Sequence, residues 1–222
     1  MHQTPVHEQH NPDLLRLIPL TTRRVVEVGC SSGALAREYK KLNVGCHYLG
    51  IDIDPTYAKL AERYCDEVLV LDIEQITESY LAEHLAADCW IFGDSIEHLM
   101  DPWRLLQTIR SHIPPDGCIV TCIPNMQHWS IQAKLNDGRL RYEDSGLLDR
   151  THLRWFTRTT MVEMFHMARF KIVEGFPRIF NEPGRDRVLN AIRAMAQLLG
   201  ADPERAVSDA LPLQYVVRAV PT

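Results

Sequence analysis

The segment from Arg24 to Gly33 limits the possible folds of this chain more than any other stretch does. It reads Arg-Val-Val-Glu-Val-Gly-Cys-Ser-Ser-Gly, and its β-branched residues predict a short buried strand. The glycines at 29 and 33 predict a sharp turn, and residues 34–42 then have the apolar spacing of a helix. A strand that breaks on glycine and reopens as a helix directs unpaired backbone N–H groups at whatever lies above the sheet edge. The segment therefore predicts an α/β fold with a ligand at this turn.

Asp52 ends the next predicted strand and lies 23 residues after Gly29. An acidic residue at this distance can hold the two hydroxyl groups of a ribose. The dinucleotide fingerprint G-x-G-x-x-G would require glycine at positions 31 and 34, where the chain has Ser31 and Ala34. The pattern that fits is an acid followed by two spaced glycines, namely Glu27, Gly29 and Gly33. The order of strand, glycine turn, helix, strand and acid predicts a nucleoside-cofactor site.

Five apolar strands alternate with helical segments in the first 123 residues. Strands are expected at 25–28, 48–51, 67–71, 89–93 and 118–123, and helices at 34–42, 55–64, 77–86 and 102–112. This alternation predicts a parallel sheet with right-handed crossovers, in which ligands lie outside the carboxyl ends of the strands. Asp52, Asp72 and Asp94 each follow a strand, so we expect them to converge on one crevice.

The remainder of the chain predicts a long insertion and four further elements. Residues 124–158 show no single period, and irregular insertions of this length usually form lids or binding loops. Thr157 is a suitable N-cap for a helix over 158–168, and a strand is expected at 170–176. An amphipathic helix at 187–199 ends at Gly200, and a last strand occupies 213–220. The whole chain, residues 1–222, is expected to form one domain with a substrate-binding lid around 124–158.

Composition and charge restrict the class of protein. The formal net charge of −5 gives no long-range attraction for nucleic-acid phosphates. No apolar stretch is long enough to span a membrane, and the N-terminus lacks a signal-peptide core, so we expect a cytoplasmic protein. The six cysteines form no C-x-x-C pair, which favours reduced buried thiols over disulfides or zinc ligands.

These motifs, taken in order, resemble the class I S-adenosylmethionine (SAM) methyltransferases. The resemblance implies a Rossmann-like, mostly parallel seven-stranded sheet with helices on both faces, whose last strand runs antiparallel between the fifth and the sixth. It also implies SAM as cofactor and S-adenosylhomocysteine as product. In that family the acid after the second strand binds the ribose and the acid after the third faces the adenine amine, which map to Asp52 and Asp72. Residues 93–102 resemble the family's Glu-His-Leu segment, which borders the methionine part of the cofactor. The expected cofactor-binding residues are Glu27, Gly29, Cys30, Ser31, Gly33, Asp52, Ile53, Asp72, Ile73 and Asp94.

A narrower resemblance concerns residues 147–157, Leu-Leu-Asp-Arg-Thr-His-Leu-Arg-Trp-Phe-Thr. This block is similar to one in bacterial methyltransferases associated with glycosyltransferases and cell-surface glycan assembly. It implies that the methyl acceptor is a sugar, a nucleotide sugar or a related hydroxylated metabolite. The residues expected to bind the acceptor are Asn125, Trp129, Tyr142, Arg150, Arg154 and Trp155.

Methyl transfer from a sulfonium is an in-line displacement, so the protein must align the acceptor and remove its proton. Histidine suits the second task because its ordinary pKa lies near neutrality. His98, His128 and His152 lie in predicted active-face loops. We favour His152, since Arg150 and Arg154 flank it and could position an anionic group, and we place His98 second.

A divalent ion is the main alternative to a purely histidine-based site. Asp94, Glu97 and His98 have the spacing i, i+3, i+4, which could hold such an ion, and ubiquinone-pathway O-methyltransferases have a similar arrangement. Our expectation is nevertheless a site without metal.

Two other functions stay open at this point. A sugar-modifying oxidoreductase that uses NAD would need the glycine absent at position 31 and a Tyr-x-x-x-Lys pair that the chain lacks. A non-catalytic SAM-binding subunit of a partner enzyme is compatible with every motif above. We expect a small-molecule or glycan-precursor substrate and no nucleic-acid partner, and we leave a homodimer open.

Overall fold

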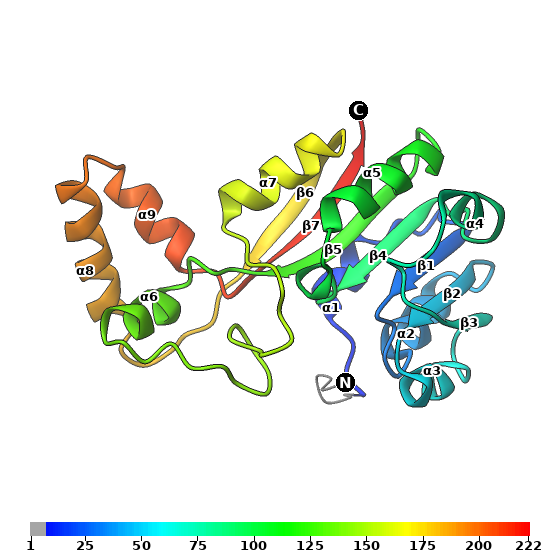
Figure 1. The fold of residues 1–222 in the computed structure, drawn as a ribbon, viewed down its shortest axis with the longest axis horizontal. Coiled ribbons are helices and arrows are strands. Elements are labelled where there is room, and N and C mark those ends of the chain that lie inside the picture. Colours follow the sequence, from blue (N-terminus) through cyan, green and yellow to red (C-terminus); the bar gives the residue numbers. More distant parts are fainter. Residues whose placement is uncertain (1–7) are drawn as a thin grey trace.

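The computed structural model describes residues 8–222, and its centre is a seven-stranded sheet (Figure 1). The strands are β1 (Arg24–Val28), β2 (His47–Asp52), β3 (Glu67–Val70), β4 (Cys89–Gly93), β5 (Cys118–Pro124), β6 (Phe170–Arg178) and β7 (Gln214–Pro221). Their order across the sheet is β3-β2-β1-β4-β5-β7-β6. The first five strands are parallel, and β7 runs antiparallel to both β5 and β6. The predicted fold class and the predicted place of the last strand are therefore confirmed.

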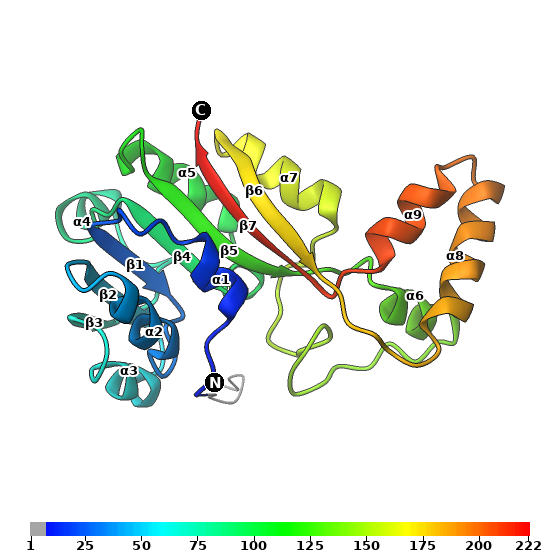
Figure 2. The same ribbon diagram turned by 180° about the vertical axis from the view of Figure 1, so that it is seen from behind.

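Helices cover both faces of the sheet and bury two separate apolar clusters. The helices of the described residues are α1 (Pro12–Leu17), α2 (Ala34–Leu42), α3 (Pro55–Ala61), α4 (Glu78–His84), the 3₁₀ helix η1 (Ile96–His98), α5 (Pro102–His112), α6 (Trp129–Asn136), α7 (Arg158–Met167), α8 (Arg185–Leu198) and α9 (Pro203–Ala210), of which α6, α8 and α9 lie beside the sheet. Helices α4, α5 and α7 pack on the face seen in Figure 1. Helices α1 and α2 pack on the opposite face, seen in Figure 2. Burial of apolar surface on both faces explains why the central strands β4 and β5 are almost continuously hydrophobic.

Three helices form an arm beside the sheet, and two of them were not expected from the sequence. Helices α6, α8 and α9 lie together at one side of the molecule (Figures 1 and 2). They bury a small cluster of Leu189, Ile192 and Ala210, with Trp129 packed against it. The expected insertion at 124–158 is thus divided, because α6 joins the arm and only residues 125–128 and 137–157 stay irregular. Neither α6 nor α9 is longer than eight residues, so each carries too little periodic signal to be read from the sequence.

The sequence expectations on cysteines and membrane spans agree with the fold. All six cysteines are free thiols, and five of them are buried. Among residues 8–222, every helix is too short or too polar to cross a membrane.

Glu27 is a carboxylic acid in the middle of the sheet. It lies on β1, is 5% exposed and accepts a hydrogen bond of 2.9 Å from the Tyr48 hydroxyl. Burial raises the pKa of Glu27 to about 8, although the Tyr48 hydrogen bond opposes the shift, and the charge of Asp52 raises the pKa further. The folded chain therefore favours the protonated acid, whereas the unfolded chain ionises near the ordinary pKa of 4.5.

This difference predicts that Glu27 makes the protein less stable as the pH rises from about 4.5 to about 8. The Glu27→Gln variant keeps an acceptor for Tyr48 and cannot ionise. Relative to its effect at pH 5, the substitution is expected to raise the free energy of unfolding at pH 8.5 by about 3 kcal/mol. Urea unfolding of both proteins at the two pH values measures this change. Glu67→Gln, at the exposed start of β3, is the control; equal pH slopes for wild type and Glu27→Gln would contradict the prediction.

Candidate functional site

A cavity of about 800 Å³ opens at the carboxyl ends of the parallel strands. Its walls come from the turns after β1, β2 and β4, from η1, from the irregular segment 145–153 and from the start of β7. A second, larger hollow of about 1130 Å³ lies along β6, α7 and α9, but none of the predicted site residues lines it. The cavity at the strand ends is therefore the candidate site.

The glycine turn shapes one end of the cavity in a way that the sequence did not predict. The N–H groups of Gly29 and Cys30 both donate to the Ile51 carbonyl oxygen, at 2.8 and 3.0 Å, and the Ser31 N–H donates to Asp52 Oδ2 at 2.9 Å. These amides, expected to grip a ligand, instead tie the turn to β2. Gly29 contributes space, because a Cβ atom there would lie 3.1 Å from the Cβ of Ser95 and its φ of +75° disfavours other residues.

The acids predicted to follow the second and third strands meet in the wall of this cavity. Asp52 is 5% exposed, and its second oxygen accepts from the Asp54 N–H at 2.9 Å, so its carboxylate is held in one orientation. The Asp72 carboxylate is likewise fixed by the Glu74 N–H at 3.0 Å. The cavity brings together seven of the ten predicted cofactor residues: Gly29, Ser31, Asp52, Ile53, Asp72, Ile73 and Asp94. The other three, Glu27, Cys30 and Gly33, do not line it.

The other end of the cavity contains an acid and two histidines. Glu97 and His98 belong to η1, directly after β4, and His152 comes from the irregular segment. The N–H groups of Leu153 and Arg154 donate to the Glu97 carbonyl oxygen at 2.8 and 2.9 Å, which fixes the segment against η1. The two imidazole rings meet edge-on with centroids 4.8 Å apart, and His152 Nε2 lies 3.9 Å from Glu97 Oε1. Both predicted catalytic histidines are therefore in contact.

Burial sets the protonation of this cluster. Burial raises the pKa of Glu97 well above its ordinary value, and the charge of Asp94 adds to the effect. Burial also lowers the pKa of His152 to about 4, helped by His98, and it lowers the pKa of His98 against the opposing Thr151 carbonyl. Both oxygens of Glu97 and Nδ1 of His152 lack a hydrogen-bond partner. Unpaired buried atoms of this kind are costly, so the cluster is suited to receive a proton or a cation from a ligand.

A metal ion would find three ligand atoms here. One atom each from Glu97, His98 and His152 lies within 4.8 Å of the others. The grouping differs from the trio considered from the sequence, because Asp94 accepts a hydrogen bond from the Gln214 side chain and His152 takes its place in the cluster. Neutral imidazoles and a carboxylate are ordinary ligands of divalent transition metals.

None of the six residues predicted to bind the acceptor lines the cavity. Asn125 is fully buried and donates to the carbonyl oxygens of Asp209 and Pro212, both at 2.8 Å, which ties β5 to the end of α9. Trp129 belongs to the arm, where its indole N–H donates to Glu182 at 3.1 Å. The third candidate base, His128, is buried beside the same Glu182 at 3.4 Å and does not line the cavity.

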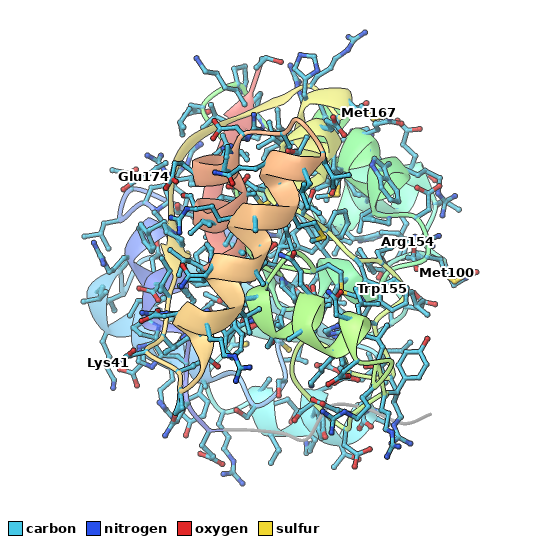
Figure 3. The ribbon with its side chains drawn as sticks, turned by 90° about the vertical axis from the view of Figure 1, so that its left-hand side faces the viewer. Lys41, Met100, Arg154, Trp155, Met167 and Glu174 are labelled. Atoms are coloured by element: carbon cyan, nitrogen blue, oxygen red, sulfur yellow. The ribbon has the colours of Figure 1, made fainter. Side chains whose placement is uncertain are left out.

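The two arginines predicted to hold an anionic substrate group bind the protein itself. Arg150 pairs with Asp144 at 2.7 Å, and the Arg154 guanidinium donates to the Met100 carbonyl oxygen. Figure 3 shows Arg154, Met100 and Trp155 at one edge of the molecule. Tyr142 and Trp155 are 65% and 45% exposed. Side-chain direction in an irregular segment has no period, so the sequence could not show that these residues point away from the cavity.

Several cavity residues were missed as binding residues. They include Met100, Leu147, Leu153, Leu213 and Gln214. Glu97 was considered from the sequence only as a ligand of a divalent ion. No sequence motif marked Gln214 as a binding residue. It lies at the start of β7, which runs antiparallel to its neighbours.

Comparisons with known proteins agree on one family. The model of a family described as "Methyltransferase domain" matches residues 5–174. A ubiquinone biosynthesis O-methyltransferase of Histophilus somni is 32% identical over 127 residues, which are 52% of this chain and 52% of that protein. The chain thus spans about half the length of the curated relatives it matches.

Two solved structures illustrate the similarity of the fold. A SAM-dependent methyltransferase from Archaeoglobus fulgidus superimposes with a TM-score of 0.59 at 19% identity, covering 90% of this chain and 86% of that one. The O-methyltransferase NcsB1 of neocarzinostatin biosynthesis, solved with S-adenosylhomocysteine and 1,4-dihydroxy-2-naphthoic acid, gives a TM-score of 0.56 at 10% identity. That match covers 94% of this chain and 52% of NcsB1. Identities this low establish the fold alone.

We expect the contact between Arg154 and Met100 to hold residues 145–155 in the wall of the cavity. Arg154→Met removes the hydrogen bonds to the Met100 carbonyl and the contact of the guanidinium with the Trp103 ring at 5.9 Å. We expect amide hydrogen exchange in residues 145–155 to become several-fold faster, while the free energy of unfolding falls by about 1 kcal/mol or less. Hydrogen exchange followed by mass spectrometry measures the exchange of residues 145–155, and urea unfolding measures the free energy of unfolding.

Arg139→Met is the matched control, because Arg139 pairs only with the adjacent Asp137 in the part of the chain that the structure describes. Unchanged exchange of residues 145–155 in Arg154→Met would show that the wall is held by other contacts.

Proposed function

The chain belongs to the methyltransferase-domain family, and on this premise we propose that it transfers the methyl group of SAM to a hydroxyl group of a small molecule. The observation that carries the proposal is that a single cavity contains both a pair of acids suited to a nucleoside and a cluster of groups suited to proton transfer. Asp52 and Asp72 lie at one end, and the cluster of Glu97, His98 and His152 lies at the other. Membership of this family rules out the alternative of an NAD-dependent oxidoreductase.

The chemistry of the cavity fits the SAM cofactor. SAM carries a sulfonium and an ammonium, and the cavity is lined by acids without a lysine or arginine among the described residues. The acids are Asp52, Asp72, Glu74, Asp94, Glu97 and Asp149. We propose that the carboxylates of Asp52 and Asp72 bind the ribose and adenine groups, and that Ile53 and Ile73 pack on the adenosine. When bound, SAM supplies an electrophilic methyl group and leaves as a neutral thioether.

His152 is proposed to take the proton of the acceptor hydroxyl at Nδ1. This atom has no partner, and the low pKa of His152 keeps the ring neutral and able to accept a proton at physiological pH. The carboxyl group of Glu97, 3.9 Å from Nε2, is proposed to face the other nitrogen of the ring, so that Nδ1 is the atom left to take the acceptor proton. His98 is proposed to hold the cluster in place, because its Nδ1 contacts the Thr151 carbonyl at 3.2 Å.

An oxygen acceptor has support beyond the site itself. The relative from Histophilus somni is named as a ubiquinone biosynthesis O-methyltransferase. The acceptor end of the cavity has apolar walls from Met100, Leu147, Leu153 and Leu213. A phenolic hydroxyl is therefore the first acceptor class that we propose. A sugar hydroxyl is the second, because Leu147, Asp149, Thr151, His152 and Leu153 of the block that resembles glycan-associated enzymes line this cavity.

His152→Ala tests the proposed base. We expect turnover to fall by roughly 10²–10⁴-fold, the usual contribution of a positioned base, while affinity for S-adenosylhomocysteine changes little. Transfer of labelled methyl groups gives the rate, and calorimetry gives the affinity. His166→Ala, on the exposed face of α7, is the control. Unchanged turnover would reject the role of His152.

Chelation separates a histidine base from a bound metal ion. We expect activity to survive EDTA, because His152 acts as the base without an ion. Loss of activity in EDTA, with recovery on adding Mg²⁺ or Mn²⁺, would assign the deprotonation to an ion held by Glu97, His98 and His152 instead.

The charge of the cavity predicts selectivity among acceptors. An anionic group would face acids with no neighbouring lysine or arginine among the lining residues, so we expect 4-methylcatechol to be used roughly tenfold better than 3,4-dihydroxybenzoate. Values of kcat/KM measure the difference. A neutral methyl glycoside and a sugar nucleotide extend the panel to the second acceptor class. Preference for the carboxylated catechol would contradict the prediction, and SAM binding without transfer to any acceptor would favour the non-catalytic alternative.

A further inference from the structure

Gln214 enters the cavity from the antiparallel strand. It is the first residue of β7, opposite Pro124 at the end of β5 and opposite Arg178 at the end of β6. Because β7 runs against the other strands, its start lies where they finish (Figure 1). Gln214 therefore faces the same edge of the sheet as Asp94 at the tip of β4.

The side-chain amide of Gln214 joins an anion to a cation. Its Nε2 donates to Asp94 Oδ1, and its Oε1 accepts from Arg178 Nη1 at 2.7 Å. A carboxylate can only accept and a guanidinium can only donate, so just one orientation of the amide satisfies both neighbours. The amide dipole is thus fixed with its N–H group towards Asp94.

Arg178 anchors the far end of this chain of contacts. Its Nε lies 3.1 Å from Asp13 Oδ2 in the first turn of α1, and its guanidinium lies over the Phe180 ring at 5.5 Å. Charges therefore alternate from Asp13 to Arg178 and, through Gln214, to Asp94. None of the bonds between these side chains needs a ligand to form.

Asp94 itself is held in an unusual backbone conformation. Its φ is +55°, a value that residues other than glycine rarely adopt, and its side chain is exposed to the cavity. A strained residue that lines a site indicates that its position is used. Enclosure by protein raises the pKa of Asp94, whereas Arg178 and the Gln214 hydrogen bond are among the contacts that lower it again.

We propose that Gln214 is a positioning residue that aims the ionised Asp94 carboxylate at the cationic methionine end of bound SAM. This inference rests on the proposed function, since it takes SAM as the ligand of the cavity. Gln214 acts through its hydrogen bond to Asp94, and it lines the cavity from the edge of the sheet where β7 begins. It makes the antiparallel strand a part of the cofactor site.

Two substitutions of Gln214 separate this role from a purely structural one. Gln214→Met keeps the length of the side chain and removes both hydrogen bonds, so SAM affinity is expected to fall about tenfold, the effect of losing a hydrogen bond to a charged group. Gln214→Glu keeps an acceptor for Arg178 but places a carboxylate beside Asp94. A purely structural bridge would lower the melting temperature of both variants and leave SAM affinity unchanged, whereas loss of a positioning residue lowers SAM affinity. We expect Gln214→Glu to bind SAM more weakly than Gln214→Met does.

Calorimetric titration with SAM measures these affinities, and melting temperatures confirm that each variant folds. Gln197→Met, on the exposed surface of α8, is the matched control and is expected to bind like the wild type. Asp94→Asn and the double variant Asp94→Asn/Gln214→Met complete a double-mutant cycle. Because Gln214 acts through Asp94, the double variant is expected to bind no more weakly than Asp94→Asn alone.

Each outcome bears on one of the two proposals. Wild-type affinity in Gln214→Glu, or fully additive losses in the cycle, would overturn the role of Gln214 and leave the proposed function standing. Absence of SAM binding by the unaltered protein would overturn the proposed function, and this inference with it.

Discussion

The parallel pairing of β1 to β5 is the constraint on which the site depends. Parallel strands finish at the same edge of a sheet, so Gly29, Asp52, Asp72 and Asp94 meet although they are distant in the sequence. Helices on both faces leave that edge as the place where polar groups reach a ligand. The position of every residue that we assign to SAM binding follows from this arrangement, whichever methyl acceptor the protein uses.

Residues fixed by a strand end could be predicted from the sequence, and residues fixed by a loop could not. Asp52 and Asp72 lie where the apolar runs stop, and the structure places both in the cavity wall. Arg154 and Trp129 were selected for their chemistry, but the first binds a carbonyl at the rim and the second binds Glu182 in the arm. Gln214 was missed because its role depends on a contact with Asp94, 120 positions earlier, which the apolar pattern of β7 does not encode even though its antiparallel direction was expected.

Burial, more than ion pairing, controls the charges at the acceptor end. Glu97 and His152 are both nearly inaccessible to water, and burial shifts their pKa values in the directions that favour uncharged forms. A ligand that enters this end removes further water and meets groups whose hydrogen bonds are still unmade. Our expectation of an uncharged acceptor rests on these unmade bonds and on the absence of Lys and Arg from the lining residues.

The arm of α6, α8 and α9 has its own consequence for how the molecule opens. Its cluster contains two large buried side chains, Leu189 and Ile192, each contributing roughly 1.5–3 kcal/mol, against the many that hold the sheet together. We therefore expect the arm to open at a lower free-energy cost than the sheet. Since Asn125 ties the end of β5 to the carbonyls of Asp209 and Pro212, opening of the arm would break the contacts that hold the segment immediately before Gln214.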